Sequence, residues 1–304
     1  MIRKLEYAVP PEFAGRTVLS FLRANGYSAR VITGLKQNPH GIMLRNKKVT
    51  VQKTLKAGDT LVIYIRDKAG ENVVPRDIPL DIPFEDRDVA VVNKPAGMAT
   101  HPSQDNYDTS LANALAFHFQ SRGEDVTVRS VNRLDKNTSG LVLIAKNQLA
   151  AAKLSAELKN GGVHKEYLAL VEGVPDDCGT VDAPIARAPG STIERMVSES
   201  GERAVTHYKL LLAGGFSLLR LTLETGRTHQ IRVHMSHIGH PVAGDFLYGT
   251  EFSGGMLRHA LHASRLSFTH PVTGETVDLF APLPDDMSAL CKKQWGEKYE
   301  ALGI

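Results

Sequence analysis

A single carboxylate, Asp135, lies in a short polar loop between two apolar segments. Residues 126–131 alternate with a period of two, and residues 141–145 form a continuous aliphatic stretch with the length of a buried strand. The loop is therefore expected to be pinned at both ends, with a carboxylate available as a nucleophile. The simpler interpretation is that Asp135 only hydrogen-bonds its own turn, because Thr, Ser, Asn and Gly around it are common turn residues.

The sequence of this loop resembles the catalytic loop of the RluA-type pseudouridine synthases, which isomerise uridine in ribosomal and transfer RNA. The resemblance rests on the string Arg-Leu-Asp-x-x-Thr-Ser-Gly-Leu at residues 133–141. Further segments match the family in the same order, at residues 91–97, 165–173, 226–235 and 261–271. The match covers residues 78–284 in all. One position departs from the pattern: many members carry His directly before Arg-Leu-Asp, and this chain has Asn132.

This resemblance implies a role for several side chains. Asp135 is the expected nucleophile, and Arg232 is expected to form an ion pair with it. Tyr167 is expected to pack on the target base and to accept a proton during the rearrangement. Arg133 is expected to fill the gap that the extruded uridine leaves, and Lys165 to support the site or bind a phosphate. Taken alone, Arg232 would be interpreted as a solvent-exposed arginine on a helix, and Tyr167 as an aromatic residue that only packs within the sheet.

The reaction breaks the bond between ribose and uracil and joins carbon five of the base to the same sugar, without a redox step. A carboxylate can bond to the sugar or to the electron-poor uracil ring and leave again, and the sequence leaves both routes open. A nearby cation favours the ionised carboxylate in a dry cleft. Residues 228–238 predict a helix with Ile231 and Met235 on its apolar face, and Arg232 lies just beside that face.

Histidines near this helix offer a competing interpretation as a metal site. They are His229, His234, His237 and His240, with Asp245 as a further candidate ligand. Only His234 and His237 are spaced to share a helix face, and histidines in an RNA enzyme more often contact phosphate or cap structure. The isomerisation needs no Lewis acid, so we expect a site without metal or cofactor.

Composition and charge describe a soluble globular protein with one basic end. Its 304 residues, 42% hydrophobic and 23% charged, are enough for two domains. The net charge is only +3, but residues 1–75 carry 13 Lys and Arg against 5 Asp and Glu, whereas the remainder carries 23 against 28. The basic end fits a module that faces RNA, and the alternative is a solvated basic surface without a partner.

The cysteines and the apolar pattern indicate the compartment. Cys178 and Cys291 cannot build a disulfide framework and lack the clustering of a zinc site, which favours a reducing environment. The N-terminus has no apolar signal core, and no apolar run is long enough to span a bilayer. We expect a cytoplasmic, monomeric protein with no membrane contact.

Residues 1–75 predict a small α+β module. The expected elements are helices over residues 18–23 and 28–35, a hairpin of residues 42–44 and 48–51, and a strand over residues 60–65. This order resembles a small RNA-binding module named after a small-subunit ribosomal protein (S-four-like), with Arg30 and Lys36 as the basic residues of its second helix. Charge, Pro and Gly from residue 66 to about residue 83 predict a linker.

Residues 76–304 are expected to form the catalytic domain. Short strands alternate irregularly with helices over residues 110–120 and 148–158, which indicates an α+β fold with a mixed, largely antiparallel sheet. The resemblance implies a cleft across that sheet and an enzyme that isomerises uridine in structured RNA, with ribosomal RNA as the favoured substrate. The alternatives are a transfer-RNA pseudouridine synthase, a catalytically silent RNA-binding or ribosome-assembly protein, and a hydrolase with an aspartate nucleophile that would release uracil.

Overall fold

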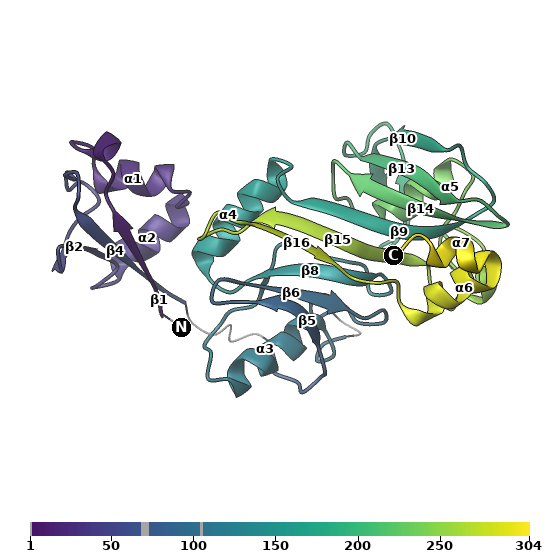
Figure 1. Cartoon of the computed structure of the whole chain (residues 1–304), viewed down its shortest axis with the longest axis horizontal. Coiled ribbons are helices and arrows are strands. Elements are labelled where there is room, and N and C mark those ends of the chain that lie inside the picture. The colour runs from purple at the N-terminus through teal and green to yellow at the C-terminus, as the bar shows by residue number, and fades with distance from the viewer. Residues whose placement is uncertain (1, 68–72, 104–105) are drawn as a thin grey trace.

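The computed structural model describes residues 2–67, 73–103 and 106–304. Residues 2–66 form a four-stranded antiparallel sheet in the order β1-β4-β2-β3, with two α-helices packed beside it (Figure 1). The elements are β1 (Ile2–Ala8), the short 3-10 helix η1 (Pro11–Phe13), α1 (Val18–Ala24), α2 (Ala29–Gln37), β2 (Ile42–Leu44), β3 (Lys47–Lys48) and β4 (Thr60–Arg66). Both helices, β2 and β4 lie where the sequence predicted them, and β1 is an additional strand that pairs with β4.

The hairpin of this N-terminal module is shorter than predicted. Arg45 and Asn46 both have positive φ, at 48° and 61°. Two consecutive left-handed residues make the tight turn that suits a two-residue hairpin loop. The second strand, predicted over residues 48–51, therefore begins at Lys47 and ends at Lys48.

The rest of the chain is built on a ten-stranded sheet. Its main path runs β10-β13-β14-β9-β15-β8-β6-β5, with β16 paired to β15 and β7 paired to β8. The strands are β5 (Asp81–Glu85), β6 (Val89–Lys94), β7 (Arg129–Ser130), β8 (Ser139–Ala145), β9 (His164–Glu172), β10 (Cys178–Asp182), β13 (Val205–Leu212), β14 (Phe216–Leu223), β15 (Leu261–Thr269) and β16 (Thr276–Phe280). Among the strands of the described residues, only β8 and β15 pair in parallel. The predicted α+β fold with a mixed, largely antiparallel sheet is confirmed.

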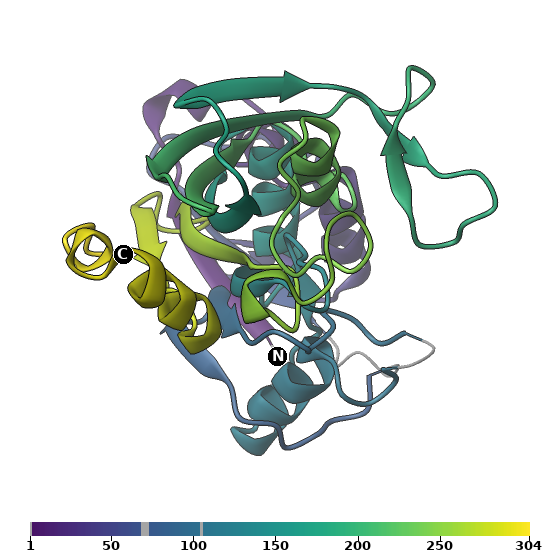
Figure 2. The same cartoon turned by 90° about the vertical axis from the view of Figure 1, so that its right-hand side faces the viewer.

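Helices cover this sheet, and one hairpin leaves it. The helical elements are α3 (Leu111–Ser121), α4 (Gln148–Lys159), α5 (Gln230–His237), η2 (Ser253–Gly255), α6 (Asp285–Trp295) and α7 (Glu297–Glu300). The first three of these α-helices were predicted. A separate two-stranded hairpin of β11 (Ile185–Arg187) and β12 (Arg195–Val197) extends away from the sheet (Figure 2). None of the described helices is both long and apolar enough to cross a membrane.

The two segments beside the polar loop differ in how well they were predicted. Strand β8 is buried along its whole length, as its aliphatic sequence indicated. Its Gly140 has φ +114°, and a Cβ there would collide with the backbone of Ala263 in β15, so only glycine allows this close strand pairing. The strand predicted over residues 126–131 is reduced to β7. At its start, the Val126 N–H bonds the Glu124 carbonyl in the turn after α3 and not a neighbouring strand.

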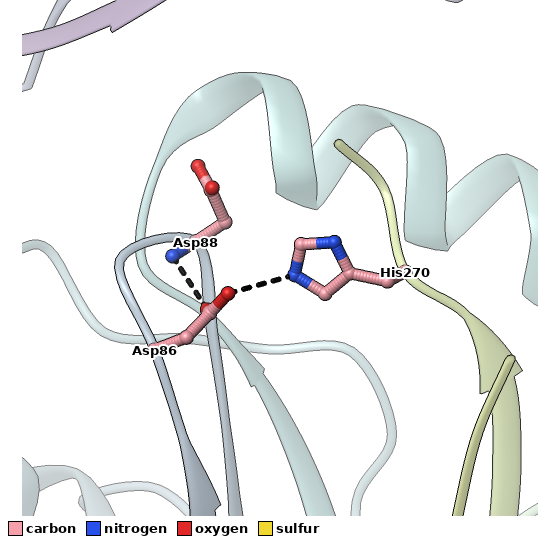
Figure 3. A group of neighbouring side chains, drawn as sticks. All are labelled: Asp86, Asp88 and His270. Carbon is pink, nitrogen blue, oxygen red and sulfur yellow. Dashed lines mark hydrogen bonds and ion pairs between the residues drawn. The ribbon is translucent and has the colours of Figure 1, made fainter. Parts of the chain in front are cut away.

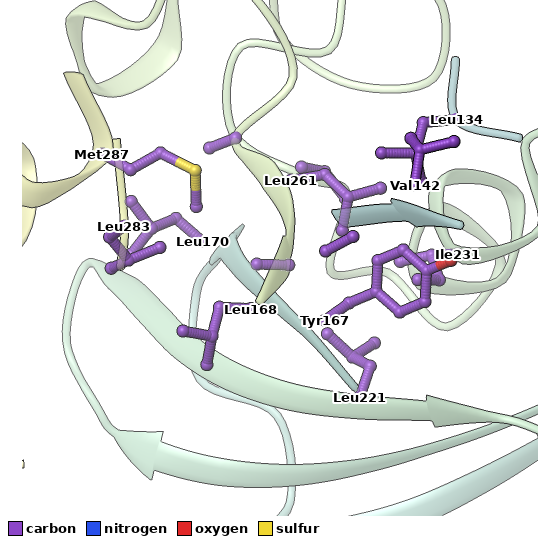
Figure 4. Close-up of a cluster of buried hydrophobic side chains, with 14 of the residues drawn as sticks. Leu134, Val142, Tyr167, Leu168, Leu170, Leu221, Ile231, Leu261, Leu283 and Met287 are labelled. Carbon is purple, nitrogen blue, oxygen red and sulfur yellow. The ribbon is translucent and has the colours of Figure 1, made fainter. Parts of the chain in front are cut away.

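The main hydrophobic core lies directly beneath the polar loop. Figure 4 shows Leu134 from the loop, Tyr167 from β9 and Ile231 from α5 gathered beside Val142 and Leu261. All five side chains are buried in one cluster. The loop is therefore anchored in the core from its inner side, which leaves its polar side chains at the surface of the cluster.

The N-terminal module docks against the large sheet through buried contacts. Leu149 at the start of α4 is fully buried within the module's own hydrophobic cluster. Arg3 of β1 donates hydrogen bonds of 2.9 and 2.7 Å to Asp88, and Arg129 of β7 donates bonds of 3.0 and 2.7 Å to Asp67 at the end of β4. Apolar packing and two bidentate ion pairs thus join the module to the sheet.

Asp88 belongs to a small polar cluster with Asp86 and His270 (Figure 3). The His270 Nδ1 accepts a hydrogen bond from the Thr273 N–H, so Nε2 carries the hydrogen, and it lies 3.0 Å from Asp86 Oδ2. Side chains of this kind can hold a metal ion, but the carboxylate of Asp88 is already bound by Arg3. The cluster therefore ties the β5–β6 turn to the β15–β16 turn beside the module.

The Arg3–Asp88 pair predicts a measurable contribution to stability. Replacing Arg3 with Met would leave the buried carboxylate of Asp88 without its cation, and we expect a loss of about 3 kcal/mol in the free energy of unfolding. Urea denaturation of the full chain measures this. The matched control is Lys4→Met, which breaks the exposed pair with Glu6 and should leave the stability nearly unchanged. Equal losses of stability from the two substitutions would contradict a stabilising role for the Arg3–Asp88 pair.

Candidate active site

Asp135 lies in the loop between β7 and β8, and its side chain is 27% exposed. The Thr138 N–H donates to the backbone carbonyl of Asp135, not to its carboxylate. The turn is therefore closed without the carboxylate, contrary to the simple interpretation of a turn-forming aspartate. Leu134, the preceding residue, exchanges hydrogen bonds with the hydroxyl of Thr100, which fixes the backbone next to the carboxylate.

Cations hold the outer half of this loop through its backbone carbonyls. The Lys94 ammonium is completely buried and donates to the carbonyls of Pro95, Met98 and Lys136 at 2.8, 2.8 and 3.2 Å. Three N–H donors thus meet three acceptors, which only the ammonium form can satisfy. Burial, helped by the charge of Arg258, lowers the pKa of Lys94 to about 7, and the charge of Asp135 opposes this.

Two neighbours from the far end of the chain complete the support. Arg258 donates to the Asn137 carbonyl at 3.1 Å, and His259 Nε2 lies 2.8 Å from the Thr138 hydroxyl. Burial lowers the pKa of His259 to about 3, so this ring is neutral at ordinary pH. The loop is therefore held by hydrogen bonds to residues about 120 positions away in sequence.

Asn132, where many family members carry His, also holds the loop. Its side-chain amide donates to the Leu141 carbonyl at 3.3 Å and accepts from the Leu143 N–H at 2.8 Å. These bonds join the start of the loop to β8. Asn132 therefore supports the loop backbone, and its side-chain hydrogen bonds go to β8 and not to Asp135.

Arg232 of α5 contacts the carboxylate of Asp135, but its main partner is another aspartate. Its Nε and one terminal nitrogen donate to Asp245 at 2.6 and 2.7 Å, and the other terminal nitrogen lies 3.4 Å from Asp135 Oδ2. Burial alone would raise the pKa of Asp245, but the hydrogen bonds from Arg232 outweigh it and hold that pKa below its ordinary value. The expected pair with Asp135 is present, and Asp245, considered above as a metal ligand, is the residue that orients Arg232.

Tyr167 of β9 is buried beside Asp135 and lines the same small pocket, together with Arg232 and His229. Burial, assisted by the negative charge of Asp135, raises the pKa of its phenol. Its hydroxyl has no hydrogen-bond partner within the described part of the chain. The hydroxyl is therefore protonated at neutral pH and free to contact a bound molecule.

A cleft of about 840 Å³ adjoins this pocket, and Asp135 and Tyr167 line both. Its lining includes the basic residues Arg133, Lys159, His164, Lys165, His207 and Arg227, together with the acidic Glu166 and Glu224. Arg133 is exposed and donates to the Thr228 hydroxyl at 2.6 Å. Burial lowers the pKa of Lys165. Two predicted residues, Arg30 and Lys36, lie apart from the cleft, exposed on α2 of the N-terminal module.

The histidines considered as a metal site do not converge. Both ring nitrogens of His234 are engaged, one with the Thr206 hydroxyl and the other with the Ala183 carbonyl, each at 2.9 Å. The His240 Nδ1 donates to the Glu172 carbonyl. His234 and His240 therefore bind protein partners through these nitrogens, which does not favour the metal interpretation.

Sequence comparisons place the chain among known proteins. Residues 88–237 match the family model described as RNA pseudouridylate synthase. The chain is 44% identical over 280 residues to the uncharacterized RNA pseudouridine synthase YjbO of Bacillus subtilis, covering 91% of this chain and 98% of that protein. It is 40% identical to ribosomal large subunit pseudouridine synthase D of Zymomonas mobilis, covering 86% of each protein.

A solved structure agrees with these matches. Human RNA Pseudouridylate Synthase Domain Containing 1 is similar to this chain with a TM-score of 0.58 and 29% identity, covering 70% of this chain and 87% of that one. The resemblance seen in the loop motif and its companion segments is thus confirmed over most of the chain. This protein belongs to the RNA pseudouridylate synthase family.

Proposed function

We propose that this pseudouridine synthase acts on uridines of ribosomal RNA and uses the carboxylate of Asp135 as its nucleophile. The observation that carries the proposal is the placement of Asp135: a partly exposed carboxylate in a cleft lined by several basic side chains, 3.4 Å from a buried arginine. Relatives named for the large ribosomal subunit support the choice of ribosomal RNA.

The cleft suits a polyanion. Cationic side chains along its walls can neutralise phosphates, and the released counterions then supply affinity that does not depend on sequence. Arg133 stands at the rim, next to the nucleophile, where its guanidinium can stack in place of an extruded base. Lys165 lines the same cleft and serves as a phosphate contact.

In the proposed reaction the Asp135 carboxylate bonds to the sugar or to the uracil ring, and the bond from ribose to N1 of uracil breaks. The base turns, carbon five bonds to the same sugar, and the bond to Asp135 breaks. Carbon five then loses a proton, and N1 gains one. Because the pKa of Tyr167 is raised, its hydroxyl can take the proton only by passing its own hydrogen on. Asp135, which lines the same pocket and is free again after the new bond forms, is a suitable acceptor.

Asp135→Asn keeps the size of the side chain and removes its nucleophilic charge, so we expect loss of pseudouridine formation with stability and RNA affinity retained. Release of tritium from large-subunit ribosomal RNA transcripts carrying 5-tritiated uridine measures the reaction. The control is Asp176→Asn at an exposed aspartate, which should be fully active. Turnover of Asp135→Asn within tenfold of wild type would refute the assignment, and free uracil as the wild-type product would indicate a hydrolase.

Substitutions of Tyr167 separate stacking from proton transfer. Tyr167→Phe keeps the ring and should bind the same RNA normally, with turnover reduced about a hundredfold because the hydroxyl is lost. Tyr167→Ala should in addition lose roughly 1 to 3 kcal/mol of binding, the value of stacking one base on an aromatic ring. Filter binding and single-turnover tritium release measure the two effects. A Phe variant with near-normal turnover would show that the ring alone is needed.

The N-terminal module is proposed to be an RNA anchor. Arg30 and Lys36 are exposed on α2, in a segment with a marked excess of basic residues. The double variant Arg30→Gln, Lys36→Gln should bind ribosomal RNA more weakly, with a slope of log affinity against log salt that is lower by about one to two. The matched control is Lys292→Gln, Lys293→Gln on α6. An unchanged slope in the α2 variant would argue against this role.

A further inference from the structure

His229 has an unfavourable backbone conformation at the edge of the active site. Its φ of 59° and ψ of 17° lie in the left-handed region, directly before the first residue of α5. A positive φ is uncommon for a residue other than Gly, although Asn, Asp and His adopt it more often than the remaining residues. The side chain is nevertheless packed, with 11% of it exposed, and its Nε2 lies 3.8 Å from Asp135 Oδ2.

Tyr248 contacts Nδ1 of this ring and favours the tautomer that carries its hydrogen on Nε2. The backbone N–H of Arg195 in β12 donates to the Tyr248 oxygen at 2.8 Å, which leaves the hydroxyl hydrogen free to donate to His229 Nδ1, also at 2.8 Å. Burial lowers the pKa of His229, with the charge of Asp135 opposing and that of Arg232 assisting, so the ring is neutral near pH 7. Its Nε2 then carries the hydrogen and faces the carboxylate.

Tyr248 also contacts the second group that faces this carboxylate. The guanidinium of Arg232 lies over the Tyr248 ring, 5.0 Å from the ring centre, and the Tyr248 N–H donates to Asp245 Oδ1. One tyrosine therefore holds both the histidine and the arginine. Both groups approach the same oxygen of Asp135, Oδ2, and no described residue donates a hydrogen bond to Oδ1.

We propose that His229 is a positioning residue for the nucleophile. Its Nε2–H and Arg232 approach Asp135 Oδ2 from two directions, so that Oδ1 is the oxygen presented to the uridine. Tyr248 fixes the tautomer in which the hydrogen on Nε2 is attracted to this carboxylate oxygen. The proposal rests on the proposed role of Asp135 as nucleophile. It explains why the chain keeps a histidine in a conformation that glycine or asparagine would adopt more easily.

The tautomer can be tested without RNA. In protein with ¹⁵N-labelled histidine, the His229 signal should show a neutral ring with hydrogen on Nε2 at pH 7, and it is identified by its absence from the spectrum of His229→Asn. In Tyr248→Phe, which removes only the hydroxyl and keeps the ring beneath Arg232, the same signal should shift toward a mixture of the two tautomers. Hydrogen on Nδ1 in the wild-type protein would overturn the proposal.

Kinetics test the consequence for the reaction. On 5-tritiated large-subunit ribosomal RNA transcripts, His229→Asn and Tyr248→Phe should each lower kcat about ten- to a hundredfold, the effect of a misplaced reacting group, with KM nearly unchanged. Because both act through the same ring, the double variant should be no slower than His229→Asn alone. Asparagine tolerates the left-handed backbone, so His229→Asn should keep its unfolding temperature.

The outcomes separate this proposal from the proposed function. Full activity of His229→Asn, or multiplicative losses in the double variant, would overturn the positioning role. If Asp135→Asn is inactive in the same assay, that result leaves the nucleophile assignment intact. If Asp135→Asn is active, the proposed function fails and the positioning role fails with it.

Discussion

A buried guanidinium shared by two carboxylates determines the geometry of this candidate active site. Arg232 is almost fully removed from water, and an isolated charge there would be strongly unfavourable. Asp245 compensates by accepting two of its N–H groups and, in doing so, fixes the plane of the guanidinium. The remaining terminal nitrogen then points toward Asp135. The candidate site therefore depends on a structural ion pair between Arg232 and Asp245, and the loop that carries Asp135 meets this pair from a distant part of the chain.

The loop reaches that position because donors from several strands and turns converge on its backbone. Lys94 at the end of β6 and Arg258 before β15 each bind loop carbonyls, and Asn132 ties the loop to β8. Hydrogen bonds to charged donors are stronger than neutral ones and are directional. The charge of Asp135 in turn acts on Lys94 and opposes the lowering of its pKa, so a group that shapes the loop is also coupled electrostatically to the carboxylate.

Local patterns were enough to predict the elements that carry the site. The aliphatic run of β8, the period of α5 and the turn residues of the loop each lie within about a dozen residues, and the structure places all three as expected. The pairing of Arg232 with Asp245 and the carbonyl acceptors of Lys94 were not predicted, because those contacts depend on which strands meet in the sheet. Residues 91–97, which include Lys94, were recognised as part of the family resemblance. The burial of Lys94 and its three carbonyl acceptors follow only from the fold.

The joint between the N-terminal module and the sheet has a consequence for how such chains can change in evolution. Leu149 completes the core of the module although it lies on a helix of the catalytic unit, and Asp88 receives an arginine from the first strand of the chain. A module transplanted to another enzyme would lose a core residue and expose an apolar surface. Exchange by simple recombination at the connecting segment is thus disfavoured, and the two units are expected to diversify together as one heritable block.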